Sequence, residues 1–224
     1  MNVKVVVFDL DDTLYDEINF VKSGFQRVAS FFSQQYNLDA KIFYDEMLLV
    51  LEKEGRGKVF DNSLKKFNIF NKSNVKKAIS VYRTHYPDIK LNPSSVKLLE
   101  YLRSLDIPVY VVTDGNKIVQ ANKVNALKIN QYCKKIFITH RYGRKHSKPS
   151  TYCFEKISEL EGCCYRDVVY VGDNINKDFV NIKKLGFRTV RIINGMFKDV
   201  IKSKEYHAEA EIYDILDLKD ILEL

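Results

Sequence analysis

The sequence predicts an α/β fold in which a doubly wound parallel sheet forms the core and a helical domain is inserted near its start. Two observations predict it. Short, nearly continuous apolar runs rich in β-branched residues recur along the chain, as expected for strands buried on both faces of a sheet. Amphipathic helical patterns separate most of these runs, and such alternation is typical of parallel sheets with right-handed crossovers.

The first expected strand covers residues 3–8, and the alternation is then interrupted. Residues 16–93 contain no convincing strand, and their apolar side chains recur at steps of three and four, as in amphipathic helices. We therefore expect a helical cap domain at 16–93, with hinges near 14–16 and 91–94. The α/β core is expected to consist of residues 1–15 and 94–224.

After the insertion the alternation of strands and helices resumes and continues along the core. Gly186 follows the last expected helix, at a position where glycine commonly ends helices. The further strands are expected at 107–112, 135–139, 168–171 and 188–193, and the helices at 94–104, 116–126, 149–160 and 178–185.

Composition restricts the class of function. The 224 residues are 46% hydrophobic and 29% charged, which is typical of a globular protein. The N-terminus lacks a secretory pattern and no apolar run approaches the ~20 residues of a membrane span, so we expect a cytoplasmic protein with no membrane partner. The net charge of +7 is dispersed without interleaved aromatic residues, so no nucleic-acid partner is expected.

Acidic residues follow the most apolar strand directly. Side chains alternate along an extended chain, so Asp9 and Asp11 should project to the same side just beyond that strand. Ligands of open α/β sheets bind at this edge, outside the carboxyl ends of the strands. Because crowded carboxylates resist ionisation unless a cation offsets them, the pair predicts a binding site.

Three later segments should reach the same edge. Thr113 ends the second strand, and the turn after it offers backbone N–H groups to an anion. Asp173 and Asp178 follow the fourth strand. Lys148 precedes Pro149, which is suited to the first position of a helix. A lysine at a helix N-terminus opposes the helix dipole, and this misfit predicts an anion beside Lys148.

In this order the motifs resemble those of the haloacid dehalogenase superfamily of hydrolases. The matching segments are Asp-x-Asp-x-Thr at 9–13, Thr113, Lys148 and Gly-Asp-x-x-x-x-Asp at 172–178. The insertion resembles the helical cap of that superfamily, and the core resembles its Rossmann-like sheet. The resemblance implies a phosphatase that acts on a small phosphorylated metabolite.

The resemblance also implies a role for each motif residue. Asp9 would attack phosphorus and form an aspartyl-phosphate, while Asp11 would protonate the leaving group and later activate water. The residues implied to hold the phosphoryl oxygens are Thr113, Asp114, Gly115 and Lys148.

Mg²⁺ is the cofactor that the resemblance implies, and Mg²⁺ prefers hard oxygen ligands. Its implied ligands are the carboxylates of Asp9 and Asp173 and the backbone carbonyl of Asp11. Asp178 is expected to bind the metal directly or through water.

The sequence leaves two other functions open. A phosphosugar mutase could share every motif, since a sugar hydroxyl would replace water as the phosphoryl acceptor. A receiver-like phospho-Asp signalling module, or an anion-binding module, also combines an aspartate, a threonine and a lysine on a parallel sheet. A dehalogenase is less favoured, because that branch lacks the acid found here as Asp11.

Overall fold

The computed structural model describes residues 3–222, and the chain divides into two compact units. One unit comprises Met1–Glu17 and Lys90–Leu224 and contains the sheet; we call it the sheet unit. The other, Ile18–Ile89, is built from helices and is called the helical unit. That the helical unit acts as a cap stays a prediction.

The sheet unit is built on six parallel strands in the order β3-β2-β1-β4-β5-β6. Each of the five expected strands is present, and the α/β fold class is confirmed. A sixth strand was not predicted, because three residues of mixed exposure carry too little pattern to be recognised. The strands are β1 (Val5–Phe8), β2 (Val109–Thr113), β3 (Lys135–Ile138), β4 (Val168–Gly172), β5 (Arg188–Ile192) and β6 (Ala210–Ile212).

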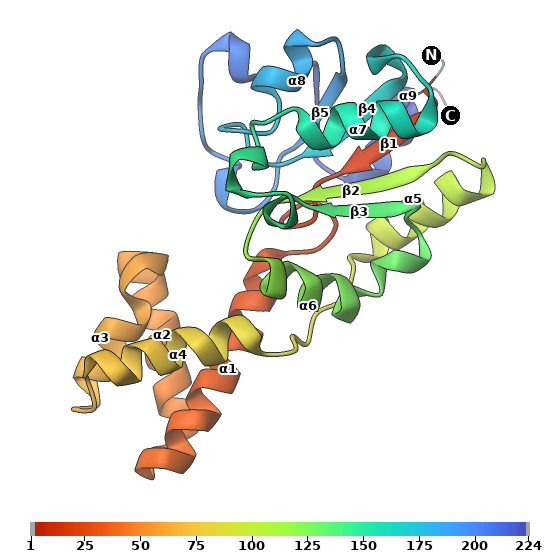
Figure 1. Ribbon diagram of the computed structural model, residues 1–224. Coiled ribbons are helices and arrows are strands. Elements are labelled where there is room, and N and C mark those ends of the chain that lie inside the picture. Colours follow the sequence, from red (N-terminus) through yellow and green to blue (C-terminus); the bar gives the residue numbers. More distant parts are fainter. Residues whose placement is uncertain (1–2, 223–224) are drawn as a thin grey trace. The chain divides into compact units, whose positions relative to one another are not determined.

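Helices cover both faces of this sheet, as Figure 1 shows. On one face lie α5 (Pro93–Ser104) and α6 (Lys117–Leu127), and on the other α7 (Tyr152–Glu161) and α8 (Val180–Lys184). A short helix, α9 (Leu218–Leu222), lies near the end of the described chain. The central strands β1, β2 and β4 are buried along their whole length, which explains their continuous apolar sequence.

Two expected helix starts were wrong. The helix expected from Pro149 begins at Tyr152, and Pro149 lies in a turn before it; the Lys148–Pro149 peptide bond is cis. The helix expected from Asp178 begins at Val180. In both places a loop that carries motif residues is longer than the hydrophobic pattern indicated.

The helical unit contains α2 (Ala40–Glu54), α3 (Val59–Lys66), α4 (Lys72–Thr84) and all but the first residue of α1 (Glu17–Tyr36). Aspartate and asparagine side chains cap two of these helices: Asp39 accepts from the N–H of Ile42, and Asn71 accepts from that of Asn74. The apolar faces of the helices meet in a hydrophobic core of aliphatic and aromatic side chains. It includes Phe25, Phe32, Phe43 and Met47.

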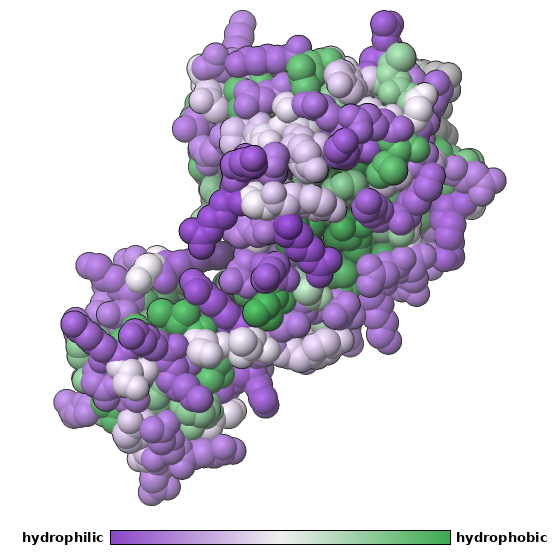
Figure 2. All heavy atoms as spheres, viewed as in Figure 1, coloured by the Kyte–Doolittle hydropathy of each residue, from purple (hydrophilic) through white to green (hydrophobic). Residues whose placement is uncertain are grey.

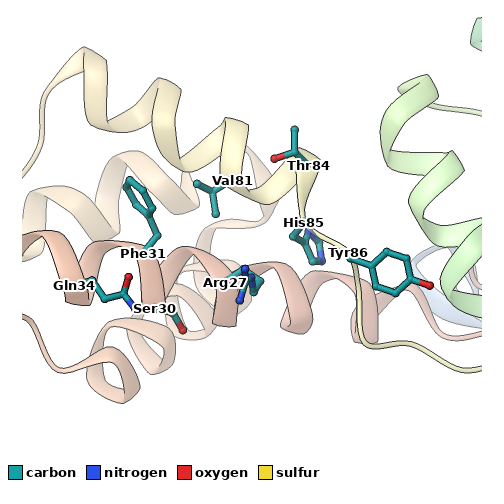
Figure 3. Close-up of a pocket in the computed structure, with 8 residues that line it drawn as sticks. All are labelled: Arg27, Ser30, Phe31, Gln34, Val81, Thr84, His85 and Tyr86. Carbon is teal, nitrogen blue, oxygen red and sulfur yellow. The ribbon is translucent and has the colours of Figure 1, made fainter.

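A groove of about 380 Å³ lies within the helical unit, between α1 and the end of α4 (Figure 3). Its lining is mixed, from Arg27 and Gln34 on α1 to Val81 on α4. None of the motif residues lines it. Figure 2 shows mostly hydrophilic residues over the visible face of each unit. Within residues 3–222, the structure has no helix with the length and apolar character of a transmembrane span.

Candidate active site

The site is assembled where three neighbouring strands end. Asp9 directly follows β1, Thr113 is the last residue of β2, and Asp173 directly follows β4. β1 lies between β2 and β4, and the N–H of Asp9 donates to the carbonyl of Val171 at 2.8 Å. The strand register therefore brings the first, second and fourth motif segments to one edge of the sheet.

Three buried carboxylates converge at this edge. Asp9, Asp173 and Asp178 each offer an oxygen within 4.8 Å of the others. All three residues are at most 5% exposed. Gly172 makes room for this arrangement, since a Cβ there would lie 2.5 Å from a carboxylate oxygen of Asp178. Asp9, Asp173 and Asp178 are called the carboxylate cluster below.

Lys148 supplies a positive charge to the carboxylate cluster. Its Nζ lies 2.9 Å from an oxygen of Asp9 and 2.9 Å from one of Asp178, and it donates to the Tyr170 hydroxyl at 2.8 Å. The expectation that Lys148 stands at a helix N-terminus was wrong, because α7 begins at Tyr152. Its charge is balanced by carboxylates, so the predicted misfit with a helix dipole does not arise.

The pKa values in the carboxylate cluster are shifted because its charged groups are buried close together. Burial, together with the charge of Asp178, raises the pKa of Asp9 to about 7 despite the opposing charge of Lys148. Burial and the charges of Asp9 and Asp178 raise the pKa of Asp173 to about 9. Burial alone would lower the pKa of Lys148, but the same two neighbours, Asp178 and Asp9, raise it well above its ordinary value.

The residues present fit a hard divalent cation. The cluster brings three carboxylates into a buried site, and Lys148 offsets only part of that negative charge. Oxygen ligands of this kind suit Mg²⁺, and a cation would relieve the repulsion that opposes ionisation. Three of the four predicted ligand residues form the cluster. The side chain of the fourth, Asp11, points elsewhere, which agrees with its being assigned only a backbone carbonyl.

Asp114 has a structural role that the sequence did not indicate. Its carboxylate accepts from the Thr139 hydroxyl at 2.7 Å, from Lys177 Nζ at 2.9 Å and from the N–H of Lys148 at 3.1 Å. Asp114 thus ties the loop after β2 to the loop that carries Lys148. The neighbouring Gly115 has φ +139°, a conformation that favours glycine. Phosphate binding by this turn stays a prediction.

The carboxylate of Asp11 is held by three side chains that the sequence analysis missed. Tyr15 donates to Oδ1, Lys123 Nζ lies 2.7 Å from Oδ1, and Gln120 donates to Oδ2 at 3.0 Å. Gln120 and Lys123 lie three residues apart on α6, so they share one face of that helix. This spacing, in the helix that follows Thr113, was the available signal.

The fold and the site together are those expected of a hydrolase, and comparison with known families identifies which one. The family described as haloacid dehalogenase-like hydrolase matches residues 6–192. The chain belongs to this family. The resemblance recognised in the motifs is therefore confirmed, and it excludes the receiver-like alternative.

Individual relatives cover nearly the whole chain. A glyceraldehyde 3-phosphate phosphatase of Methanocaldococcus jannaschii is 29% identical over 98% of this chain and 97% of its own length. A protein of the same name from Pyrococcus abyssi is 26% identical over 99% of this chain and 94% of its own length.

Solved structures show the same fold. The magnesium-bound HAD-hydrolase YfnB of Bacillus subtilis aligns over 100% of both chains with a TM-score of 0.69 and 17% identity. An HAD phosphatase of Thermococcus onnurineus aligns over 98% of both chains with a TM-score of 0.62 and 21% identity. At these identities the likeness concerns the fold alone.

Proposed function

We propose that the protein is a Mg²⁺-dependent phosphomonoesterase that works through an aspartyl-phosphate on Asp9. The observation that carries this proposal is the position of Asp9: it belongs to a buried carboxylate cluster, and Lys148 lies 2.9 Å from it. An anion that entered beside Asp9 would meet the charge of Lys148 and of any bound cation. The site thus suits attack by a carboxylate on a phosphoryl group.

In the first step, a carboxylate oxygen of Asp9 bonds to phosphorus while the bond from phosphorus to the ester oxygen breaks. Asp11 gives a proton to that oxygen, so the alcohol leaves and the aspartyl-phosphate remains. Thr113 and Lys148 are the proposed partners of the phosphoryl oxygens. When bound, Mg²⁺ supplies positive charge against the carboxylates and the phosphoryl group.

In the second step, the Asp11 carboxylate takes a proton from water, and the water oxygen attacks phosphorus. The bond between Asp9 and phosphorus breaks, and inorganic phosphate leaves. Asp11 is then protonated again and ready for the next cycle. One residue thus serves as acid and as base, which divides a slow hydrolysis into two easier transfers.

For the substrate we propose a small phosphorylated metabolite, with glyceraldehyde 3-phosphate as the first candidate. Relatives that align over nearly the whole chain are named glyceraldehyde 3-phosphate phosphatases, which supports hydrolysis over the phosphosugar mutase alternative. At 24–29% identity the side chains that contact the alcohol part of a substrate can differ. The candidate therefore needs a direct test.

The proposal is tested with purified protein, Mg²⁺ and a panel of phosphate esters. The panel contains p-nitrophenyl phosphate, glyceraldehyde 3-phosphate, glycerol 3-phosphate, 2-phosphoglycolate and glucose 1-phosphate, and released phosphate is measured separately from isomerised sugar phosphate.

We expect Asp9→Asn to abolish phosphate release while the circular dichroism spectrum is unchanged, because the nucleophile is lost. Asp220→Asn, at an exposed position of α9, is the control and should retain wild-type rates. Turnover by Asp9→Asn would refute the assignment.

A further inference from the structure

The buried amine of Lys123 lies on the side of Asp11 that faces the protein interior. The side chain of Lys123 is 3% exposed, whereas that of Asp11 is 21% exposed. Lys123 thus contacts Asp11 from behind, while Asp11 keeps an accessible part for a substrate. Both oxygens to which the Lys123 amine is paired belong to carboxylates of the protein, Asp11 and Glu17, so its proposed action on the reaction is through Asp11.

Both oxygens of Asp11 are held by the same helix face. Lys123 Nζ lies 2.7 Å from Oδ1, and the Gln120 amide donates to Oδ2 at 3.0 Å and also to the hydroxyl of Thr113. Tyr15 is a second donor to Oδ1. With a donor on each oxygen, the carboxylate cannot rotate freely about its Cβ–Cγ bond without losing a hydrogen bond.

Lys123 has a second carboxylate partner, Glu17, at 3.2 Å. Glu17 is the first residue of α1 and the last of the N-terminal segment of the sheet unit. The amine therefore links the loop after β1 to α6 and is itself fixed from two sides. Removing a buried lysine from water is costly, and buried ion pairs are weak contributors to stability compared with apolar packing. Because the pair includes Asp11, the proposed acid and base, we infer that Lys123 has a role in the reaction and not only in stability.

We propose that Lys123 is a positioning residue for the reaction: it fixes the direction of the Asp11 side chain, so that the proton of the carboxyl form is delivered to the leaving group. The inference rests on the proposed function and adds to it a residue outside the four motifs. Lys123 acts through Asp11 and touches neither phosphate nor metal. Gln120 supports the same orientation from one turn earlier on α6.

The choice of leaving group makes the inference testable. p-Nitrophenolate leaves without a proton, whereas the alkoxide of an alkyl phosphate needs one. The ratio kcat/KM covers steps only up to departure of the leaving group, so it excludes the shared hydrolysis of the aspartyl-phosphate. A loss of correctly directed Asp11 should therefore lower kcat/KM for an alkyl phosphate far more than for p-nitrophenyl phosphate.

The experiment compares Lys123→Met with wild type, using p-nitrophenyl phosphate and the alkyl phosphate of the panel that wild type hydrolyses fastest. We expect kcat/KM for the alkyl ester to fall about 100-fold, the scale of general acid catalysis, and that for the aryl ester to change little. Lys123→Arg keeps a charged donor. Its ratio of kcat/KM for the alkyl ester to kcat/KM for the aryl ester should therefore be closer to that of wild type. Lys134→Met, which removes a 57% exposed lysine and its ion pair with Glu161, is the control and should leave the alkyl-to-aryl ratio of kcat/KM unchanged.

Equal losses on both esters would overturn the inference, because a purely structural lysine lowers the amount of competent enzyme for every substrate alike. An alkyl rate that rises in Lys123→Met would also overturn it. If Lys123→Met does not fold, Lys123→Gln is measured in its place, since it keeps a neutral donor. Failure of wild type to hydrolyse any ester would count against the proposed function and not against Lys123.

Discussion

At the scale of single residues, Lys148 joins two of the three acids of the carboxylate cluster. Its side chain is 1% exposed and pairs with Asp9 and Asp178 at 2.9 Å each. The pairs lie out of solvent, so salt screens them little, and the loss of one partner leaves the others buried and uncompensated. Lys148 therefore matters to folding as well as to the proposed chemistry.

We expect Lys148→Met to lower the free energy of unfolding by about 3–5 kcal/mol when measured in excess chelator, because it leaves buried charge unpaired. Turnover of p-nitrophenyl phosphate should be lost as well. Urea denaturation followed by circular dichroism measures the stability. Lys134→Met removes a lysine that is 57% exposed, and its effect should stay within about 0–1 kcal/mol. A Lys148→Met protein as stable as wild type would contradict this account of the cluster.

At the scale of elements, the ring of Tyr82 on α4 packs against α1 at Gly24, where the absence of a side chain leaves room for it. A Cβ at Gly24 would lie 2.5 Å from two ring carbons of Tyr82 and 3.1 Å from the ring of His85. The Tyr82 ring in turn packs edge-on against Phe20 and Phe60, so it has little room to shift. Glycine in a helix lowers the stability of that helix, and the close packing that Gly24 permits offsets this loss.

We expect Gly24→Ala to destabilise the helical unit. Overpacking costs about 1–3 kcal/mol, against a gain of about 0.5–1 kcal/mol from helix propensity. Thermal unfolding by scanning calorimetry measures the effect. Gly57→Ala is the matched control, because no atom lies within 4 Å of a Cβ there and its φ is not left-handed; it should be neutral or slightly stabilising. An equal or higher melting temperature for Gly24→Ala would show that Tyr82 moves aside.

At the scale of the whole molecule, the carboxylate cluster couples stability to pH and to a metal. The pKa values of Asp9 and Asp173 are raised to about 7 and about 9, from about 4 in the unfolded chain. The folded state thus binds protons more tightly than the unfolded state. The corresponding stability is fully present below about pH 4 and is lost as the pH rises through about 7 and about 9.

We expect the metal-free protein to lose stability between about pH 6 and about pH 9, and Mg²⁺ to restore it. Mg²⁺ competes with protons for the carboxylates, so its stabilising effect should be larger at about pH 8.5 than at about pH 6. At about 100 times its dissociation constant, Mg²⁺ should add about 2.7 kcal/mol. Melting temperatures in excess EDTA and in MgCl₂, at both pH values, measure the effect.

Asp173→Asn provides the control for the pH experiment, since it removes the carboxyl group whose pKa is raised to about 9. Its metal-free stability should depend less on pH, and Mg²⁺ should stabilise it less. A response to Mg²⁺ that is the same at both pH values in wild type would argue against a metal at the carboxylate cluster.

Much of the fold was predictable because its signals are local. The buried strands β1, β2 and β4 are apolar along their whole length, and the positions that follow them carry the motif acids and hydroxyl. Since parallel strands bring their carboxyl ends to one edge, strand order along the chain was enough to expect that the motif residues meet. β6 escaped prediction because its three residues have no such pattern.

The fold class, the family and the residues that meet at the edge of the sheet could all be predicted from the sequence, because each depends on patterns within a few neighbouring residues. The side chains around Asp11 and Lys148, in contrast, are known only from the three-dimensional structure. Lys123 and Gln120 lie 112 and 109 residues from Asp11, and their spacing on α6 places them on one helix face without indicating which group they contact. The surroundings of Lys148 likewise depend on long-range contacts, since its partners Asp9 and Asp178 lie in the loops after β1 and β4.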